Sequence, residues 1–533
     1  GRGGNTMTTT QAPQDFLTTL ATTHPDKLAV VEDLPDGTIR HWSYAEFEAN
    51  ACRLARVLMA EGVGAKDRVI WCGQNSPWVV ALMAAARKLG AVAVPLNYRL
   101  TAEEAAYVVD NSDAAVAFID AELQPLFEGL RSEAPKLKTV LVFDAARQGL
   151  AVSEAHVDAE PLIAAAESVA LPPAGAAGGT MIYTSGTTGK PKGAVRFGGA
   201  DPAQTQRMIA FYGVHGDDVY LTTGPLYHSG PSGFMATGQL LGQTVVLQKK
   251  FDAEDWLRLL DKYNCSSTFS APAPIRLVCN LPDEVVARYD RSSMRVMIAN
   301  AAPWSYALKL MYLERFPEDS LFEVYGSTEL GVNAILRPEF QRSKKGSCGE
   351  PAPGCEIRLY DEEGKVVSTP HTEGELFVRS ASVFDTYHKA EDKFQEDRRD
   401  GEWQTVGDIA YFDEEGFYYI CDRKKDMIIS GGVNIYPAEI EGALEQHPDV
   451  VDVAVFGIPS EEWGEMVHAE VVQRPGASLS AEALMAFARE HLAGYKVPRS
   501  VKFIAEIPRT GTGKILKREL RKPYWEGRAS RVG

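Results

Sequence analysis

Residues 183–193 read Tyr183-Thr184-Ser185-Gly186-Thr187-Thr188-Gly189-Lys190-Pro191-Lys192-Gly193, a segment with three glycines, four serine or threonine hydroxyls and two lysines. Glycines let backbone N–H groups approach an anion, hydroxyls add donors, and lysines add positive charge. The composition predicts a phosphate-binding loop, to which a solvated Gly/Ser/Thr loop is the alternative on composition alone. A Walker A loop, GxxxxGK followed by Ser or Thr, is excluded because Thr184 and Pro191 occupy two of its required positions.

Strands and helices alternate on the N-terminal side of this segment. Ser43 precedes a helical stretch with its apolar residues near one face, and residues 82–89 predict a second helix. Residues 68–71 and 91–94 have the pattern of short buried strands. This alternation favours an α/β fold, in which parallel-type sheets of a large N-terminal domain carry helices on their faces.

The pattern changes in the C-terminal part of the chain. Residues 374–420 favour an antiparallel β-rich subdomain, and the charged run 422–426 is expected to be solvated. Beyond it lies a small α+β pattern, with a helix from Pro437 to about Gln446 and a strand over 452–458. A further helix is expected to begin after Ser480 and to stop at Gly494. We therefore expect two domains, residues 8–424 and a mobile α+β domain of residues 425–533.

The overall composition is that of a globular protein. The chain has 533 residues, of which 45% are hydrophobic and 24% charged, and its net charge is −17. The acidic balance argues against nucleic acid or an anionic membrane surface as the main partner. Small phosphate-bearing ligands remain compatible with it, because local loops and a few cations can hold phosphates.

Cysteine usage and hydropathy bear on location. The seven cysteines form no CxxC pair, so neither a disulfide framework nor a zinc site is expected, and a cytoplasmic location is favoured. The apolar stretch 78–95 is interrupted by Arg87 and Lys88, so it predicts a helix and a strand rather than a transmembrane segment. Peripheral membrane contact and the oligomeric state stay open.

Six further motifs lie after the first segment along the chain. They are Pro225-Leu226-Tyr227-His228-Ser229-Gly230, Tyr325-Gly326-Ser327-Thr328-Glu329, Thr405-Val406-Gly407-Asp408, Asp422-Arg423-Lys424-Lys425-Asp426, Ser430-Gly431-Gly432-Val433-Asn434-Ile435-Tyr436-Pro437 and Pro508-Arg509-Thr510-Gly511-Thr512-Gly513-Lys514. With the first segment they resemble the ordered motifs of the adenylate-forming superfamily, which contains acyl-CoA synthetases, peptide-synthetase adenylation domains and insect luciferases. The resemblance covers nearly the whole chain.

The resemblance implies an acid–CoA ligase. A carboxylic acid would attack the α-phosphate of ATP, and the acyl-adenylate would then react with the co-substrate coenzyme A to give acyl-CoA, AMP and pyrophosphate. The implied ATP- and AMP-binding residues are Thr184, Ser185, Gly186, Thr187, Thr188, Gly189, Lys190, Lys192, Tyr325, Gly326, Ser327, Thr328, Asp408 and Arg423. Glu329 would hold Mg²⁺, which prefers oxygen ligands.

The resemblance also assigns the remaining roles. Lys514 is the implied catalytic lysine, Glu329 and His228 are further implied catalytic residues, and Lys425 is the implied hinge about which the C-terminal domain rotates. Gly431 and Gly432 would line the CoA tunnel. The implied acyl pocket comprises Tyr227, His228, Asn300, Ala301, Ala302, Gly331 and Val332.

Small and apolar pocket residues favour a fatty acid as the substrate, and a bulky steroid or aryl acid stays open. Phe384-Asp385-Thr386-Tyr387 stands where the family often has Gly-Tyr, and Arg196-Phe197 where a Thr-His pair is common. One alternative is an acyl-AMP ligase that loads a carrier protein. Another is a nucleotide- or acyl-binding protein that has lost catalysis, against which Glu329, Asp408 and Lys514 argue.

Overall fold

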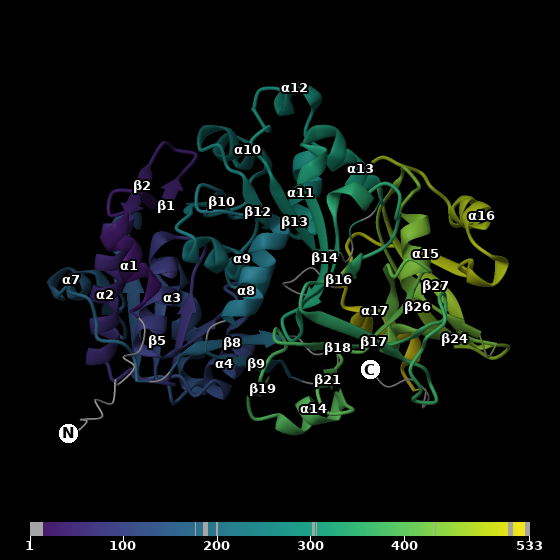
Figure 1. Cartoon of the computed structure of the whole chain (residues 1–533). Helices are drawn as coiled ribbons and strands as arrows, with labels where there is room; N and C mark the ends of the chain where they lie inside the picture. The colour runs from purple at the N-terminus through teal and green to yellow at the C-terminus, as the bar shows by residue number, and fades with distance from the viewer. Residues whose placement is uncertain are drawn as a thin grey trace, which may run out of the picture. The chain divides into compact units, whose positions relative to one another are not determined.

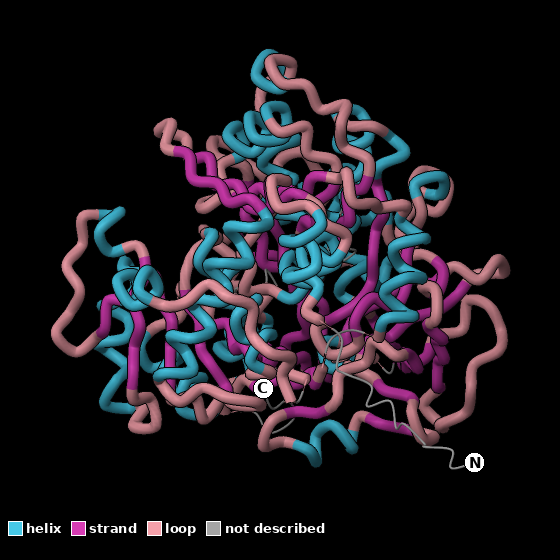
Figure 2. Tube along the Cα trace, turned by 60° about the vertical axis from the view of Figure 1, so that its left-hand side comes forward, coloured by secondary structure: helices cyan, strands magenta, loops and turns pink. Residues whose placement is uncertain are grey.

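The computed structural model describes residues 14–175, 177–184, 190–198, 201–300, 304, 306–431, 433–509 and 515–527. The chain divides into two compact units, the first formed by residues 1–182, 195–200 and 214–251 and the second by 183–194, 201–213 and 252–533. Helices and strands alternate through much of the chain, and the mixed α/β architecture is as predicted (Figures 1 and 2). Residues on both sides of Lys425 belong to the second unit, so the domain boundary near that residue stays a prediction.

The first unit contains two groups of paired strands. One has the order β10 (Val219–Leu221), β11 (Thr244–Leu247), β1 (Leu28–Asp33) and β2 (Ile39–Ser43), of which β1 and β2 are antiparallel. The other is parallel, with the order β7 (Val157–Asp158), β6 (Thr139–Phe143), β5 (Val116–Asp120), β3 (Arg68–Cys72), β4 (Val92–Pro95) and β8 (Gly179–Thr184). The predicted parallel sheet is therefore confirmed.

Eight α-helices accompany these strands among the described residues of the first unit. They are α1 (Phe16–Thr23), α2 (Tyr44–Ala60), α3 (Pro77–Leu89), α4 (Ala102–Asn111), α5 (Gln124–Leu130), α6 (Ala145–Gln148), α7 (Ala159–Ala165) and α9 (Ser229–Leu240). None of the helices in the described ranges is long and apolar enough to cross a membrane.

Capping decides where the first helices begin and end. Ser43 caps α2 as predicted, in a capping box with Glu46. Helix α3 begins at Pro77 rather than at residue 82, because the Ser76 side chain accepts the N–H of Val79 and proline suits the first turn. Strand β4 begins at Val92 rather than at residue 91, because the Ala91 N–H still donates to a carbonyl of the helix.

The second unit has a further sheet region and an antiparallel β-rich part. The former has the order β12 (Ser267–Ser270), β13 (Val296–Asn300), β14 (Leu321–Ser327), β15 (Gly331–Leu336) and β16 (Glu350–Pro351), and its first three strands are parallel. The latter has the order β20 (Arg398–Arg399), β21 (Trp403–Gln404), β18 (Gly374–Ser380), β22 (Asp408–Phe412) and β23 (Tyr418–Arg423), and β17 (Cys355–Tyr360) also pairs with β18. This confirms the predicted β-rich subdomain.

Six α-helices and one short strand among the described residues complete this part of the second unit. They are α8 (Pro202–Tyr212), α10 (Ala253–Lys262), α11 (Pro272–Cys279), α12 (Asp283–Val286), α13 (Tyr306–Arg315), α14 (Glu391–Glu396) and β19 (Thr386–Tyr387). Strand β9 (Lys192–Phe197) lies between β8 and β19 in the strand order, and it contains residues of both units.

The C-terminal residues form a small sheet with three helices. Its strands are β25 (Val433–Ile435), β24 (Ile428–Ser430), β27 (Gly464–Gln473) and β26 (Val450–Ser460), and β28 (Ser500–Phe503) pairs in parallel with β27. The helices are α15 (Pro437–Leu444), α16 (Ala481–His491) and α17 (Lys517–Trp525). Apolar side chains of α15, α16 and the strands share one core, as the predicted α+β pattern requires.

Three expectations for these residues are wrong in detail. Helix α15 ends at Leu444 rather than near Gln446, and β26 is longer than the predicted strand 452–458. Helix α16 is capped by Ser480 as predicted but ends at His491, because Leu492 turns to extended backbone and packs against the core, so that Gly494 lies beyond the helix.

The charged run 422–426 is only partly solvated, contrary to expectation. Lys424 and Lys425 are exposed, whereas the side chains of Asp422 and Asp426 are largely buried. Burial is tolerated because both carboxylates are paired with basic residues of α17. The sequence pattern could not reveal this, because the partners lie far along the chain.

Candidate active site

The ends of the predicted phosphate loop lie close together. Thr184 ends β8 and Lys192 begins β9, which is next to β8 in the strand order. The Thr184 hydroxyl donates to the Lys192 carbonyl oxygen at 3.4 Å. Lys190 is exposed and Lys192 is half-buried. The two ends of the predicted loop are therefore held by neighbouring strands. The remaining predicted phosphate-binding residues lie outside the described residues; they are Ser185, Gly186, Thr187, Thr188 and Gly189.

Three predicted nucleotide-binding residues converge from three strands. Tyr325 lies on β14, Asp408 begins β22, and Arg423 ends β23 in register with Asp408. The Tyr325 hydroxyl donates to Asp408 Oδ2, and Arg423 Nε is 4.0 Å from Asp408 Oδ1. The antiparallel pairing of β22 and β23 thus places a carboxylate and a guanidinium beside the tyrosine.

The electrostatics of this group determine the protonation of Tyr325. Burial raises the pKa of Tyr325 well above its usual value, and the Asp408 carboxylate raises it further. Tyr325 is therefore a neutral phenol that donates a hydrogen bond to Asp408 and presents an aromatic ring. This orients Asp408, which can accept hydrogen bonds from the vicinal hydroxyls of a ribose.

Glu329 lies on the turn that connects β14 to β15. The two strands approach closely at Gly326, where an added Cβ would lie 2.1 Å from the Gly331 carbonyl oxygen. Gly331 has a φ of +72°, and a Cβ there would meet Ser382 at 2.8 Å. The Ser327 hydroxyl accepts the N–H of Leu330 across the turn at 3.0 Å. Glycine and serine at these positions are therefore required by the turn that presents Glu329.

The sequence did not single out the residue that holds the Glu329 carboxylate. The Tyr387 hydroxyl donates to Glu329 Oε2 at 2.9 Å, and the N–H of Phe384 donates to the Glu329 carbonyl oxygen at 2.7 Å. Tyr387 is buried in an aromatic cluster with Phe384 and Phe394. Burial and the neighbouring carboxylate raise its pKa, so its hydroxyl stays protonated and donates. Tyr387 lies in the segment 384–387, which departs from the usual family pattern. This departure was the only feature of the sequence that drew attention to Tyr387.

Glu329 suits a hard divalent cation. It is a half-buried carboxylate that accepts a hydrogen bond from Tyr387, and oxygen ligands are those that Mg²⁺ prefers. Within the described ranges no three His, Cys, Asp or Glu side chains gather as a metal-binding group. A single carboxylate fits Mg²⁺ bound mainly through substrate phosphates and water, which is its usual mode in nucleotide sites.

Tyr227 and His228 lie together in the first unit. The Tyr227 ring packs edge-on against Tyr98 and His228, with centroids 5.5 Å and 4.3 Å away. His228 is the extended residue before α9. The Asn75 side chain donates to the Gly224 carbonyl and accepts the N–H of Leu226, both at 2.9 Å, so it holds the turn before these two residues. Asn75 is a supporting residue that no motif indicated.

The predicted acyl pocket remains a prediction. Tyr227 and His228 belong to the first unit, whereas Asn300, at the end of β13, and Gly331 and Val332, which begin β15, belong to the second. The other two predicted pocket residues, Ala301 and Ala302, lie outside the described residues.

The C-terminal motifs are described in part. Lys425 is exposed in a short 3₁₀ turn, Lys424–Asp426. Gly431 has a φ of +57° in the turn after β24, and its N–H donates to the Trp463 carbonyl at 2.9 Å. Gly432 and Lys514 lie outside the described residues. Arg509 and Ile515, the described residues on either side of Lys514 in the sequence, form an antiparallel bridge.

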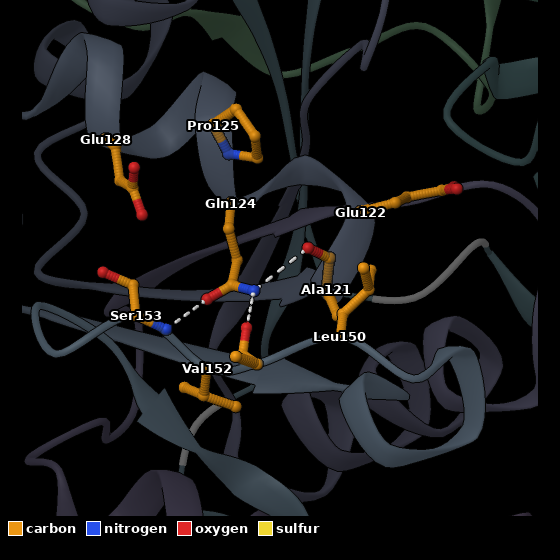
Figure 3. Close-up of a pocket in the computed structure, with 9 residues that line it drawn as sticks. Ala121, Glu122, Gln124, Pro125, Glu128, Leu150, Val152 and Ser153 are labelled. Carbon is orange, nitrogen blue, oxygen red and sulfur yellow. Dashed lines mark hydrogen bonds between the residues drawn. The ribbon is translucent and has the colours of Figure 1, made fainter.

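A separate pocket in the first unit contains none of the predicted site residues. Figure 3 shows it around Gln124, whose amide donates to the carbonyls of Ala121 and Ala151 and accepts the N–H of Ser153. These contacts use the polar atoms of Gln124 within the protein. They are typical of loop stabilisation rather than of ligand recognition.

The family models decide the family. Residues 17–388 match the AMP-binding enzyme model, and residues 439–514 match the model of the AMP-binding enzyme C-terminal domain. The chain belongs to the AMP-binding enzyme family. This family is that of the adenylate-forming enzymes, as the motifs predicted.

Curated relatives and solved structures agree with this AMP-binding family. The chain is 35% identical to an indoleacetate–CoA ligase of Aromatoleum aromaticum, over 90% of this chain and 93% of the relative. It is 34% identical to the long-chain-fatty-acid–CoA ligase FadD13 of Mycobacterium tuberculosis, over 95% and 97% of the two chains. The crystal structure of the anthranilate CoA ligase AuaEII with anthranoyl-AMP superposes with a TM-score of 0.83 at 25% identity, covering 96% of each chain.

The first prediction concerns Tyr387. Tyr387→Phe removes the hydrogen bond to Glu329 and keeps the ring, so adenylate formation should slow about 10-fold, the usual cost of a bond to a charged group. The variant should also need more Mg²⁺. The measurement is pyrophosphate release against Mg²⁺ concentration, with Glu329→Gln as the reference for complete loss of the carboxylate charge.

Tyr360→Phe is the matched control for this variant. The Tyr360 hydroxyl also donates to a carboxylate, that of Asp400, at 2.5 Å. This control should leave the Mg²⁺ dependence unchanged. A normal Mg²⁺ dependence and rate in Tyr387→Phe, beside an impaired Glu329→Gln, would show that Tyr387 does not orient the carboxylate.

Proposed function

We propose that the chain is an AMP-forming acid–CoA ligase. The observation that carries this proposal is the convergence of Tyr325, Asp408 and Arg423, with Glu329 on the turn that follows Tyr325. A tyrosine ring, an oriented carboxylate and a guanidinium are the groups that an adenosine with its phosphates requires. The match to both family models supports the same nucleotide chemistry.

In the proposed first step a substrate carboxylate attacks the α-phosphorus of ATP and pyrophosphate leaves. Tyr325 would pack on adenine, Asp408 would accept from the ribose hydroxyls, and Arg423 would contact the ribose or a phosphate. Lys190, Lys192 and the loop between β8 and β9 would hold the β- and γ-phosphates. Mg²⁺, when bound, neutralises phosphate charge, and Glu329 would hold it with the support of Tyr387.

In the proposed second step the thiol of CoA attacks the acyl carbon and AMP leaves. Lys514 must withdraw and the thiol must enter, so the C-terminal residues are proposed to rotate about Lys425. Gly431 and Gly432 would then face the pantetheine arm, where the absence of a side chain leaves room. The left-handed backbone of Gly431 provides an independent reason for glycine at that position.

For the acid we propose a hydrophobic monocarboxylic acid, with a fatty acid first. The similarity to FadD13 supports a fatty acid, and the similarity to an indoleacetate–CoA ligase supports an aryl acid as the second candidate. Tyr227 is buried and borders His228, so the predicted pocket wall in the first unit is aromatic. An aromatic wall suits either kind of apolar acid.

The second prediction is the outcome of an acid panel. Long- and medium-chain fatty acids, indole-3-acetate and a dicarboxylic acid are each incubated with ATP and Mg²⁺, with and without CoA, and AMP, pyrophosphate and thioester are measured. At least one apolar monocarboxylic acid should give acyl-CoA, and the dicarboxylic acid should be the poorest substrate. A best rate with indole-3-acetate would replace the fatty acid by the aryl acid.

The same panel tests the other two functions. Pyrophosphate release that never leads to acyl-CoA, even with CoA present, would indicate an acyl-AMP ligase that loads a carrier protein. Absence of pyrophosphate release with every acid would favour a binding protein without catalysis and contradict the proposed reaction.

A further inference from the structure

Helix α17 follows directly after the segment that contains Lys514. Its C-terminal end is fixed to the small C-terminal sheet, because Trp525 Nε1 donates to the Gly457 carbonyl at 3.0 Å. The Tyr524 hydroxyl also donates to Glu470 Oε1 at 3.2 Å. Gly457 lies on β26 and Glu470 on β27, so α17 moves with this sheet.

The N-terminal half of α17 faces the segment that contains the proposed hinge. Lys517 Nζ lies 3.4 Å from Glu441 Oε1 and 3.9 Å from Asp422 Oδ2. Arg521, one turn further along the same face, has Nη1 3.2 Å from Asp426 Oδ1. Lys517 and Arg521 are each only 7% exposed, so both are buried cations whose charge needs a partner within the protein.

Asp422 precedes Lys425 in the sequence, whereas Glu441 and Lys517 follow it. Asp422 lies on β23 and pairs with Ile409 of β22, so its position is set by the β-rich sheet. Its Oδ2 atom nevertheless accepts the N–H of Ala438, in the first turn of α15, at 2.8 Å. The contacts of Asp422 with Lys517 and Ala438 therefore connect residues before the hinge with residues after it.

The charge balance makes Lys517 the central member of this group. Burial raises the pKa of Glu441 to about 8 and also raises that of Asp422, and in both cases the charge of Lys517 opposes the rise. Burial alone would lower the pKa of Lys517, but Glu441, Asp422 and Asp426 together raise it. Without Lys517, the buried carboxylates of Glu441 and Asp422 would lose the cation that they share.

We infer that Lys517 is a positioning residue that latches the C-terminal residues to the β-rich sheet across the hinge in the arrangement described here. This inference rests on the proposed rotation about Lys425. A rotation that carries α15 and α17 away from β23 must separate Lys517 and Ala438 from Asp422, while Lys517 and Glu441 move together. The latch therefore stabilises one of the two proposed arrangements, the adenylating or the thioester-forming one. Its loss should shift the equilibrium toward the other arrangement.

The third prediction tests this latch through the ratio of the two half-reactions. Lys517→Met keeps most of the apolar stem and removes the charge. It should change the ratio of the single-turnover adenylation rate to the rate of thioester formation from supplied acyl-adenylate by about 10-fold, because the buried ion pair of Lys517 with Asp422 is lost from one arrangement only. Lys517→Arg should restore the ratio, and Lys522→Met, an exposed lysine of the same helix, should leave it unchanged.

A second readout needs no substrate. Hydrogen exchange at the Ala438 amide should be faster in Lys517→Met than in the wild type or in Lys522→Met, because this amide donates to Asp422. If Lys517→Met folds poorly, the double variant Lys517→Met/Glu441→Gln removes one of the two uncompensated carboxylates and serves in its place.

The two readouts separate failure of the latch from failure of the proposed function. An unchanged ratio together with unchanged exchange at Ala438 would overturn the latch while the ligase activity stands. Equal loss of both half-reactions would likewise assign Lys517 a purely structural role. If no acid supports catalysis, the ligase proposal fails, and normal exchange at Ala438 in the variant would then overturn the latch independently.

Discussion

Replacing Lys514 with alanine should slow adenylate formation by about 10²-fold or more, the loss expected when one preorganised charge contact to a transition state is removed. We propose Lys514 as the cation that faces the α-phosphate and the attacking carboxylate. Negative charge accumulates between these groups as the new bond forms, so a nearby ammonium acts mainly in the transition state. The measurement is single-turnover pyrophosphate release with a substrate acid from the panel.

The second half-reaction is the internal comparison for Lys514→Ala. Thioester formation from supplied acyl-adenylate should change much less, because the new bond to the α-phosphorus is already formed in the bound mixed anhydride. Lys522→Ala, at an exposed position of α17, should alter neither step. Equal losses in adenylation and thioester formation would contradict the assigned role, and a normal unfolding temperature would exclude damage to the fold.

The second large effect is expected from Lys425→Pro. Proline fixes φ and restricts the residue before it, so rotation about this position should be blocked. Acyl-AMP and pyrophosphate should still form in a single turnover, whereas conversion to acyl-CoA should fall by about 10²-fold, since the acceptor no longer reaches the acyl carbon in a reactive geometry. Lys425 is exposed, so the substitution removes no buried side chain.

Gly432→Leu should give the same separation of steps for a different reason. The domain would still rotate, but a branched side chain would stand in the proposed path of pantetheine. Both variants are measured for adenylate by pyrophosphate release and for thioester by product analysis. Lys425→Ala and Gly432→Ala are the controls, because the first leaves φ free and the second adds only a methyl group.

The contrary outcomes differ for the two positions. If Lys425→Pro folds normally and forms acyl-CoA at the wild-type rate, Lys425 is not the hinge. The same result for Gly432→Leu would remove that glycine from the CoA tunnel. If both variants behave as the wild type, domain rotation is not the means by which this chain alternates between its two reactions.

Much of the architecture is determined by short stretches of sequence. Ser43 and Ser480 cap helices as their positions predict, since a cap depends on residues within one turn. The parallel strands and the antiparallel part after residue 374 follow from apolar runs and turn residues, which act locally on the backbone. The order of the motifs predicted the family, and the family models confirm it.

The chemistry of the candidate site is determined by residue type, but its geometry is not. The sequence assigns a carboxylate and a tyrosine to the nucleotide, and it gives no sign that Tyr325 donates to Asp408, a residue 83 positions away. Nor does it show that Tyr387 holds Glu329 across 58 positions. These pairs exist because strand pairing and aromatic packing bring distant segments together, and such contacts leave no period or spacing in the chain.

The charged run at the proposed hinge shows the difference most clearly. By itself, five consecutive charges at residues 422–426 predict solvation, because an isolated buried charge is costly. In the folded protein Asp426 forms an ion pair with Arg521, which lies 95 residues further along the chain, and Asp422 forms one with Lys517. The sequence determined which residues carry charge, whereas only the tertiary structure decided which charges are buried, because the cost of burial depends on a partner that the fold alone supplies.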